Sequence, residues 1–155
     1  MTRNLRNSGQ PVRMIYGIIF FMIGDRATAF VYKDNKVLMI FRHKNDNEYY
    51  VLPGGHVEEG ETLAYATTRE LLEETSIKAD FDKKLFSLID INGRTHHICL
   101  CKYISGVPKL ANDSVEVGRA SEKNIYNPMW VDVKEIKNLT IWPEQTKDFL
   151  IKYFK

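Results

Sequence analysis

The sequence has few of the residues that cross-link small secreted proteins. Its 155 residues include two cysteines, Cys99 and Cys101. Two positions apart on a strand they point to the same face, which is a poor geometry for a mutual disulfide, and two thiols fall short of a structural zinc site. We therefore expect reduced, buried thiols and a cytoplasmic protein.

The sequence also lacks an apolar run long enough to cross a lipid bilayer. The run Met14–Ile23 has ten residues, whereas a membrane-spanning helix takes about 20. No small-residue cleavage site follows the run, which argues against a signal peptide. We expect no membrane partner; the run should add a strand or make a subunit contact, the second of which would give a homodimer. A further alternative is a natural start at Met22.

Internal repeats and interdomain linkers are absent as well. A chain of this length can bury one sizeable core and fits a single domain. We expect residues 1–25 to form an N-terminal extension, made of a polar tail and the apolar run, and residues 26–155 to form the working domain.

Charge is unevenly distributed along the chain. The whole sequence has a net charge of +2, yet residues 51–80 carry −5 and the remainder carries +7. An acidic centre in a basic frame suits a metal site that acts on an anionic substrate. Ordinary solvated surface charge explains the basic part equally well.

Apolar alternation, turn residues and helix caps predict an α/β (α+β) fold in which a mixed sheet lies between helices. Strands are expected at residues 27–32, 37–41, 49–52, 84–91, 95–104 and 128–133. Asn92–Gly93 is a typical two-residue hairpin turn. Helices are expected from the N-cap Thr62 to residue 75, over residues 134–139, and from Pro143 onward. Residues 42–48 and 106–124 are expected to be loops.

Three glutamates of the first helix share one face. Glu70, Glu73 and Glu74 have the i, i+3, i+4 spacing, and they continue the stripe that begins with Leu63 and Ala66. Unpaired carboxylates on an inward stripe are costly, so positive charge must compensate them. A hard divalent cation fits such a group of oxygens, whereas an acidic face paired with lysines is the alternative.

A glycine turn precedes this helix. Gly54 and Gly55 allow a close approach of the backbone, so that a carbonyl or an amide can point into the site. His56 follows them and is a candidate to touch phosphate, although a structural role is the commoner one for a loop histidine.

The whole stretch resembles the Nudix box of the Nudix hydrolases. Gly55 is followed after five residues by Glu61, and after seven more by the run Arg69-Glu70-Leu71-Leu72-Glu73-Glu74-Thr75-Ser76-Ile77. Each fixed position of the box from Gly55 to Ile77 matches except its last glycine, where this chain has Ser76. A serine in the left-handed conformation of a helix cap costs on the order of 1 kcal/mol, so the mismatch concerns local stability and not chemistry.

The resemblance implies an α/β/α sandwich and a defined reaction. Water would attack a phosphorus of a nucleoside diphosphate linked to another moiety, with Mg²⁺ as cofactor and Mn²⁺ able to substitute. Glu70, Glu73, Glu74 and the Gly54 carbonyl match the family's metal ligands. The expected partner is a small nucleotide, and a nucleic acid polymer is not expected.

Other roles follow from the same resemblance. Arg69 should orient Glu70 or Glu61 through a fork of hydrogen bonds. The general base is either a glutamate of the box or one in the later loop, where Glu122 and then Glu116 are the candidates. A plain surface carboxylate is the alternative for both. Gly54, Gly55 and His56 are the expected substrate contacts.

Side chains for base recognition are less clearly marked. Five aromatic residues could stack on a nucleobase, with a core or rim role as the alternative for each: Phe41, Tyr49, Tyr50, Phe86 and Tyr126. His96 and His97 are consecutive on a strand and point to opposite faces, so one of them is a candidate for the cleft.

The substrate itself is not named by the motif. The marker residues of subgroups that act on ADP-ribose or on dinucleoside polyphosphates are absent from residues 92–95. This favours a nucleoside triphosphate, ordinary or oxidised, cleaved to monophosphate and pyrophosphate. ADP-ribose or a nucleotide sugar is the alternative, and so is a silent Nudix-like nucleotide sensor, although no glutamate of the box is altered.

Overall fold

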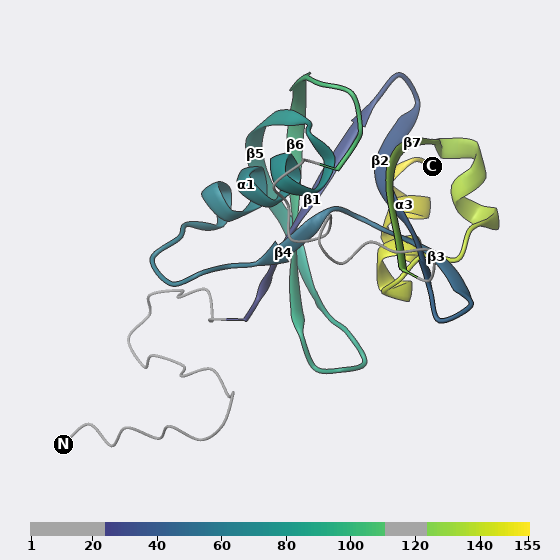
Figure 1. Ribbon diagram of the computed structural model, residues 1–155, viewed down its shortest axis with the longest axis horizontal. Coiled ribbons are helices and arrows are strands. Elements are labelled where there is room, and N and C mark those ends of the chain that lie inside the picture. Colours follow the sequence, from purple (N-terminus) through teal and green to yellow (C-terminus); the bar gives the residue numbers. More distant parts are fainter. Residues whose placement is uncertain (1–23, 111–123) are drawn as a thin grey trace.

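The computed structural model describes residues 24–110 and 124–155, which form a sheet with helices on both sides (Figure 1). In chain order the elements are β1 (Arg26–Lys33), β2 (Lys36–Lys44), β3 (Asn47–Val51), β4 (Gly54–His56), α1 (Leu63–Thr75), β5 (Lys78–Ile89), β6 (Thr95–Ser105), β7 (Asn124–Asp132), the 3₁₀ helix η1 (Val133–Asn138) and α3 (Glu144–Tyr153).

Strand β1 is the centre of the sheet. It runs parallel to β6, from the pair Arg26↔His96 to the pair Val31↔Cys101, and antiparallel to β2 and β4. Strand β2 in turn pairs with β3 and β7, and β6 pairs with β5. The sheet is therefore mixed, as the sequence predicts.

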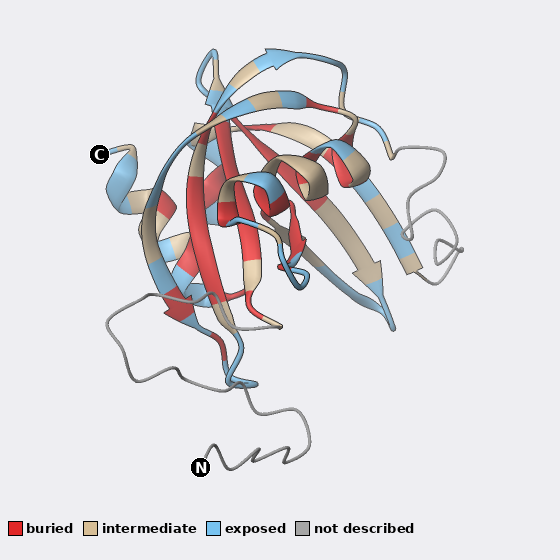
Figure 2. Ribbon diagram, turned by 90° about the vertical axis from the view of Figure 1, so that its left-hand side faces the viewer, coloured by how far each residue is buried: buried red, intermediate tan, exposed pale blue. Residues whose placement is uncertain are grey.

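Alternation along β1 explains why helices cover both faces. Ala27 and Ala29 are fully buried in the clusters that contain the α1 residues Ala66 and Leu71. Phe30 points the other way, toward Leu150 and the aromatic side chains of α3. Burial of such a side chain stabilises the fold by about 1.5–3 kcal/mol. Figure 2 shows buried residues concentrated in the central strands and on the helix face turned toward them. The predicted α/β/α sandwich is confirmed.

Both thiols lie on the α1 side of β6. Cys99 and Cys101 are free and buried, as predicted. Burial raises the pKa of Cys99 to about 11 and that of Cys101 to about 12, because the thiolate is poorly solvated there. Both therefore behave as apolar packing groups at neutral pH.

Helix α1 has the predicted start and an unusual end. The hydroxyl of Thr62 accepts a hydrogen bond from the Tyr65 amide at 3.1 Å, which confirms the N-cap. At the other end Ser76 is left-handed, with φ of 61°. Its hydroxyl donates to the carbonyl of Lys109 at 2.8 Å. This bond offsets part of the conformational cost that the sequence assigns to a serine at this position.

The predicted loop over residues 42–48 is wrong, because β2 and β3 extend into it and pair up to Lys44↔Asn47. The chain reverses at Asn45 and Asp46, both left-handed, with φ of 51° and 63°. Asn and Asp tolerate this conformation well, which is why a tight turn forms here without glycine.

The β5–β6 hairpin also differs from its prediction. Five residues and not two separate the strands. Within them the Asp90 amide donates to the Arg94 carbonyl at 2.9 Å, and the Asp90 carboxylate accepts from the amides of Asn92 and Arg94. Strand β5 begins at Lys78 and not at the predicted residue 84. Register shifts between Phe81 and Lys83, and again further along, interrupt the alternation of apolar and polar residues, so the sequence pattern does not reveal the first part of the strand.

Some predictions lie outside the described residues. These are the strand or subunit contact of Met14–Ile23, the start at Met22, and most of the long loop. The homodimer and the boundary between residues 25 and 26 stay predictions. None of the helices in the described part of the chain has the length and apolar character needed to cross a membrane.

The Ser76 cap can be tested by substitution. Alanine at position 76 has the same conformational cost of a left-handed backbone as serine, but it cannot make the hydrogen bond to Lys109. Ser76→Ala should therefore lower the free energy of unfolding by about 1 kcal/mol. Ser76→Gly loses the bond but relieves the backbone, so its stability should stay close to that of the wild type. Urea unfolding measures both. A Ser76→Ala variant as stable as the wild type would mean that the hydroxyl contributes nothing.

Candidate active site

The site begins where two glycines bring β4 between β1 and α1. A Cβ atom on Gly54 would overlap the Ala27 carbonyl, and one on Gly55 would overlap the Glu70 carboxylate. Both glycines are buried, and neither has a left-handed φ. Gly54 is therefore required for the space that a side chain would take from the backbone of β1, whereas a side chain at Gly55 would have to displace the flexible end of Glu70.

The Gly54 peptide is held from both sides. Its amide donates to the Glu74 carboxylate at 3.0 Å, and its carbonyl accepts from Arg26 Nη2 at 2.7 Å. Glu74 is 7% exposed. Burial lowers the pKa of Arg26 below its ordinary value, and the nearby charge of Glu74 opposes that shift. Two opposite charges thus meet across one buried glycine.

Arg69 is the hub of the remaining glutamates. Its Nε and Nη2 donate to the Glu61 carboxylate at 2.5 and 3.0 Å, and its Nη1 donates to Glu70 at 2.9 Å and to Glu73 at 3.2 Å. The sequence predicts a fork to Glu70 or Glu61; the structure has the fork to Glu61 and a single hydrogen bond to Glu70. The Arg69 hydrogen bonds lower the pKa of Glu61, and the pKa of Arg69 is raised in turn.

These contacts change how the acidic helix face is balanced. The sequence predicts that a bound cation, or lysines as the alternative, compensates the three glutamates. In the structure Arg69 lies against Glu70 and Glu73, and Arg26 lies near Glu74. Two arginines therefore supply positive charge from within the chain.

The donor atoms fit a hard divalent cation, because three carboxylates and a backbone carbonyl are the oxygens that such ions prefer. As these side chains stand, however, no three acidic, histidine or cysteine side chains of the described residues converge closely enough to hold a metal ion. The Glu73 side chain is 44% exposed, against 13% for Glu70. Glu73 is thus the carboxylate with the most room to turn.

The other predicted site residues are placed as follows. His56 is exposed, and its carbonyl accepts from Arg69 at 3.1 Å. Partial burial and the charges of Arg94 and Arg26 lower the pKa of His56, so its ring is neutral at pH 7. The candidate bases Glu122 and Glu116 lie outside the described residues.

The two histidines of β6 do point to opposite faces. Both are buried; His97 bonds Asp25 and the Ser87 hydroxyl, each at 2.8 Å. His96 bonds Asp90 at 2.8 Å and faces a recess on the α3 side of the sheet. His96 thus lines this recess, and its place in the substrate cleft stays a prediction.

That recess, called here the arginine recess, has a volume of about 120 Å³. Its polar and aromatic lining includes Arg26, Thr28, Arg42, Tyr49, His96 and Trp142. Of the aromatic residues predicted for base recognition, Tyr49 lines it. Phe41 packs on Tyr50, Phe86 packs on Phe149, and Tyr126 lies under the Arg42 guanidinium.

The sequence analysis did not single out the four residues Arg26, Thr28, Arg42 and Trp142. The sequence does contain a sign of Arg26 and Thr28. They are polar residues at alternate positions at the start of a mostly apolar strand, so both lie on the same face of the sheet. Arg42 and Trp142 are far apart in sequence, and only the fold brings them together.

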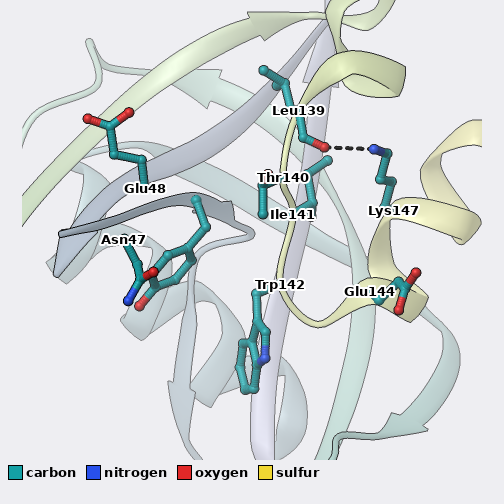
Figure 3. Close-up of a pocket in the computed structure, with 9 residues that line it drawn as sticks. Asn47, Glu48, Leu139, Thr140, Ile141, Trp142, Glu144 and Lys147 are labelled. Carbon is teal, nitrogen blue, oxygen red and sulfur yellow. Dashed lines mark hydrogen bonds between the residues drawn. The ribbon is translucent and has the colours of Figure 1, made fainter. Parts of the chain in front are cut away.

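A larger cleft of about 660 Å³, called here the outer cleft, adjoins the recess (Figure 3). Tyr49 and Trp142 line both spaces. Glu48 and Glu144 lie along the outer cleft, and Lys147 donates to the Leu139 carbonyl at 2.7 Å. With two carboxylates in its lining, the outer cleft is less suited to phosphate than the side of the recess near Gly54.

The Glu61–Arg69 pair makes a pH-dependent prediction. The pKa of Glu61 is lower in the folded protein than its ordinary value of 4.5. The ion pair therefore gives its full stabilisation when the pH is above 4.5. This stabilisation is lost as the pH falls through the pKa that Glu61 has in the folded state. Glu61→Gln should thus lower the free energy of unfolding by on the order of 1–2 kcal/mol at neutral pH, and by less at about pH 3.

Urea unfolding at both pH values measures this difference. Glu59→Gln, an exposed glutamate of the same loop, is the matched control and should change stability little at either pH. A Glu61→Gln deficit that is the same at both pH values would show that the ion pair is not its source.

Comparison with known proteins bears on this arrangement. A family model described as the NUDIX domain matches residues 22–152. An ADP-ribose pyrophosphatase of Methanocaldococcus jannaschii is 34% identical over 116 residues, which cover 71% of this chain and 69% of that protein. An RNA pyrophosphohydrolase of Pelagibacter ubique is 48% identical over 46 residues, which cover 30% of this chain and 29% of that protein.

The fold has solved counterparts as well. A hydrolase of the NUDIX family from Clostridium perfringens superposes with a TM-score of 0.63 at 14% identity, covering 84% of this chain and 94% of that one. At this identity the likeness shows the fold alone. The domain match, the archetypal spacing of the glutamates around Arg69 and the pyrophosphatase relatives lead to one conclusion: the chain belongs to the Nudix hydrolase family and is a Nudix-type pyrophosphohydrolase.

Proposed function

We propose that the chain hydrolyses a nucleoside triphosphate, ordinary or oxidised, to a nucleoside monophosphate and pyrophosphate in a Mg²⁺-dependent reaction. The observation that carries the proposal is the cluster of glutamates that Arg69 organises beside the buried Gly54 peptide. Arg26 links the Gly54 carbonyl of that cluster to the arginine recess, since it bonds the carbonyl and lines the recess.

In this proposal Glu70, Glu73, Glu74 and the Gly54 carbonyl would hold the metal. Mg²⁺, or Mn²⁺ in its place, neutralises a diphosphate when bound and lowers the pKa of a coordinated water. The carbonyl of Gly54 accepts from Arg26 at 2.7 Å. Arg26 therefore lies where it can add positive charge beside the substrate phosphates.

The chain's own residues have separable roles here. Arg69 is a positioning residue, because it fixes Glu61, Glu70 and Glu73 at once. The backbone of Gly55 and the neutral ring of His56 are the proposed phosphate contacts. A glutamate of the box or Glu122 takes the proton of the attacking water as general base.

ADP-ribose is the second candidate substrate. The observation that favours it is the relative from Methanocaldococcus jannaschii, which bears the name ADP-ribose pyrophosphatase and is 34% identical to this chain. Product analysis separates the candidates, because ADP-ribose yields AMP and ribose 5-phosphate, whereas a triphosphate yields a monophosphate and pyrophosphate. A panel of nucleotides with Mg²⁺ tests both.

Glu73→Gln tests the metal assignment. The substitution removes a negative charge from the cluster, so hydrolysis should fall by on the order of 100-fold or more. The side chain is 44% exposed and bonds Arg69 at 3.2 Å, so the fold should stay intact, as circular dichroism and thermal unfolding would report.

Two controls accompany that measurement. Glu59→Gln changes an exposed glutamate of the preceding loop and should keep full activity. Chelation of divalent ions should abolish wild-type activity, and added Mg²⁺ should restore it. Full activity in Glu73→Gln would refute the assignment of Glu73 as a metal ligand.

A further inference from the structure

The arginine recess has a one-sided chemistry. Its charged side chains are Arg26 and Arg42, and none of the described residues that line it is a carboxylate. A guanidinium offers N–H donors and no acceptor. The two guanidiniums are therefore suited to a group that presents acceptors.

Both guanidiniums are held in place. Arg26 is anchored on the Gly54 carbonyl at 2.7 Å. Arg42 donates to the Ile125 carbonyl at 3.2 Å and to the Asn124 side chain at 2.9 Å, and its guanidinium lies 3.6 Å from the centre of the Tyr126 ring. Anchored donors discriminate between ligands better than mobile ones, because they cannot turn away from a mismatched group.

Thr28 supplies an independent sign that the recess takes a ligand. Its residue is 4% exposed, it lines the recess, and its hydroxyl finds no hydrogen-bond partner among the described residues. Buried hydroxyls are nearly always hydrogen-bonded, because an unmade bond leaves the cost of desolvation uncompensated. A bound molecule that reaches Thr28 would satisfy this hydroxyl.

The size and the walls of the recess restrict that molecule. A volume of about 120 Å³ is roughly that of four water molecules, which admits the edge of a ring but not a whole nucleotide. Tyr49 and Trp142 line both the recess and the outer cleft, so a flat ring can lie against them while its edge enters the recess. Aromatic walls of this kind favour a nucleobase over a phosphate group as the occupant of the recess.

We propose that the arginine recess reads the N7/O6 edge of a substrate purine and prefers guanine or hypoxanthine, whose edge carries acceptors alone. Arginine binds that pair of acceptors through two hydrogen bonds, whereas adenine places an amino donor at position 6. Oxidation of guanine at C8 puts a hydrogen on N7, so the oxidised base is also disfavoured. This inference rests on the proposed nucleotide hydrolysis.

The test compares kcat/KM with Mg²⁺ for GTP, ITP, ATP, 7-deaza-GTP and 8-oxo-GTP. GTP and ITP share the edge and should agree within about threefold, and ATP should be at least about tenfold poorer, since one good bidentate contact accounts for that difference. 7-deaza-GTP lacks the N7 acceptor and 8-oxo-GTP has a donor there, so both should fall below GTP. ATP equal to or better than GTP would overturn the inference.

Failure of the proposed function gives a different result. If no nucleotide is hydrolysed, the proposed reaction fails while the recess is still tested by calorimetric binding of GTP and ATP to the wild type. Tighter binding of GTP would support the recess assignment, and equal or tighter binding of ATP would refute it.

Two substitutions locate the effect. Thr28→Val removes the unpaired hydroxyl with little change of shape, so stability should be unchanged or higher, while kcat/KM for GTP should fall at least about threefold. Arg42→Gln should bring the GTP/ATP ratio of kcat/KM toward one. Lys44→Gln is the matched control, because Lys44 is exposed on the same strand and does not line the recess. An unchanged GTP/ATP ratio in Arg42→Gln, together with an unchanged kcat/KM for GTP in Thr28→Val, would refute the proposal.

Discussion

The site depends on the absence of a side chain at Gly54 and on the room that Gly55 leaves for the Glu70 carboxylate. Because neither carries a Cβ, β4 lies directly against the Ala27 carbonyl on one side and the Glu70 carboxylate on the other. That approach brings a strand of the sheet and the acidic face of α1 to hydrogen-bonding distance. The bonds that Gly54 makes to Glu74 and Arg26 follow from it.

The same approach makes the acidic face of α1 electrostatically tolerable. Arg69 compensates Glu61, Glu70 and Glu73, and Arg26 reaches toward Glu74 across the Gly54 peptide. Carboxylates that would repel one another are thus held around two guanidiniums. Arg26 also lines the arginine recess, so this one side chain links the Gly54 carbonyl to the recess.

Much of the fold could be predicted from local patterns. The Thr62 cap, the buried thiols and the sandwich follow from periodicity and residue type, because these signals need only neighbours in sequence. The turn at Asn45 and Asp46 could not, since its residues resemble an ordinary polar loop until β2 and β3 pair. The early start of β5 was hidden by register shifts that break its alternation.

The sequence by itself determined the reaction: helical periodicity places Glu70, Glu73 and Glu74 on one face, and the fixed spacing to Gly55 identifies the Nudix box. Tertiary structure alone decided what surrounds that face. Arg26, Thr28, Arg42 and Trp142 come from two neighbouring strands and the segment before α3, and they meet in one recess. Local pattern could not reveal that meeting, because strand pairing and packing between distant segments produce it.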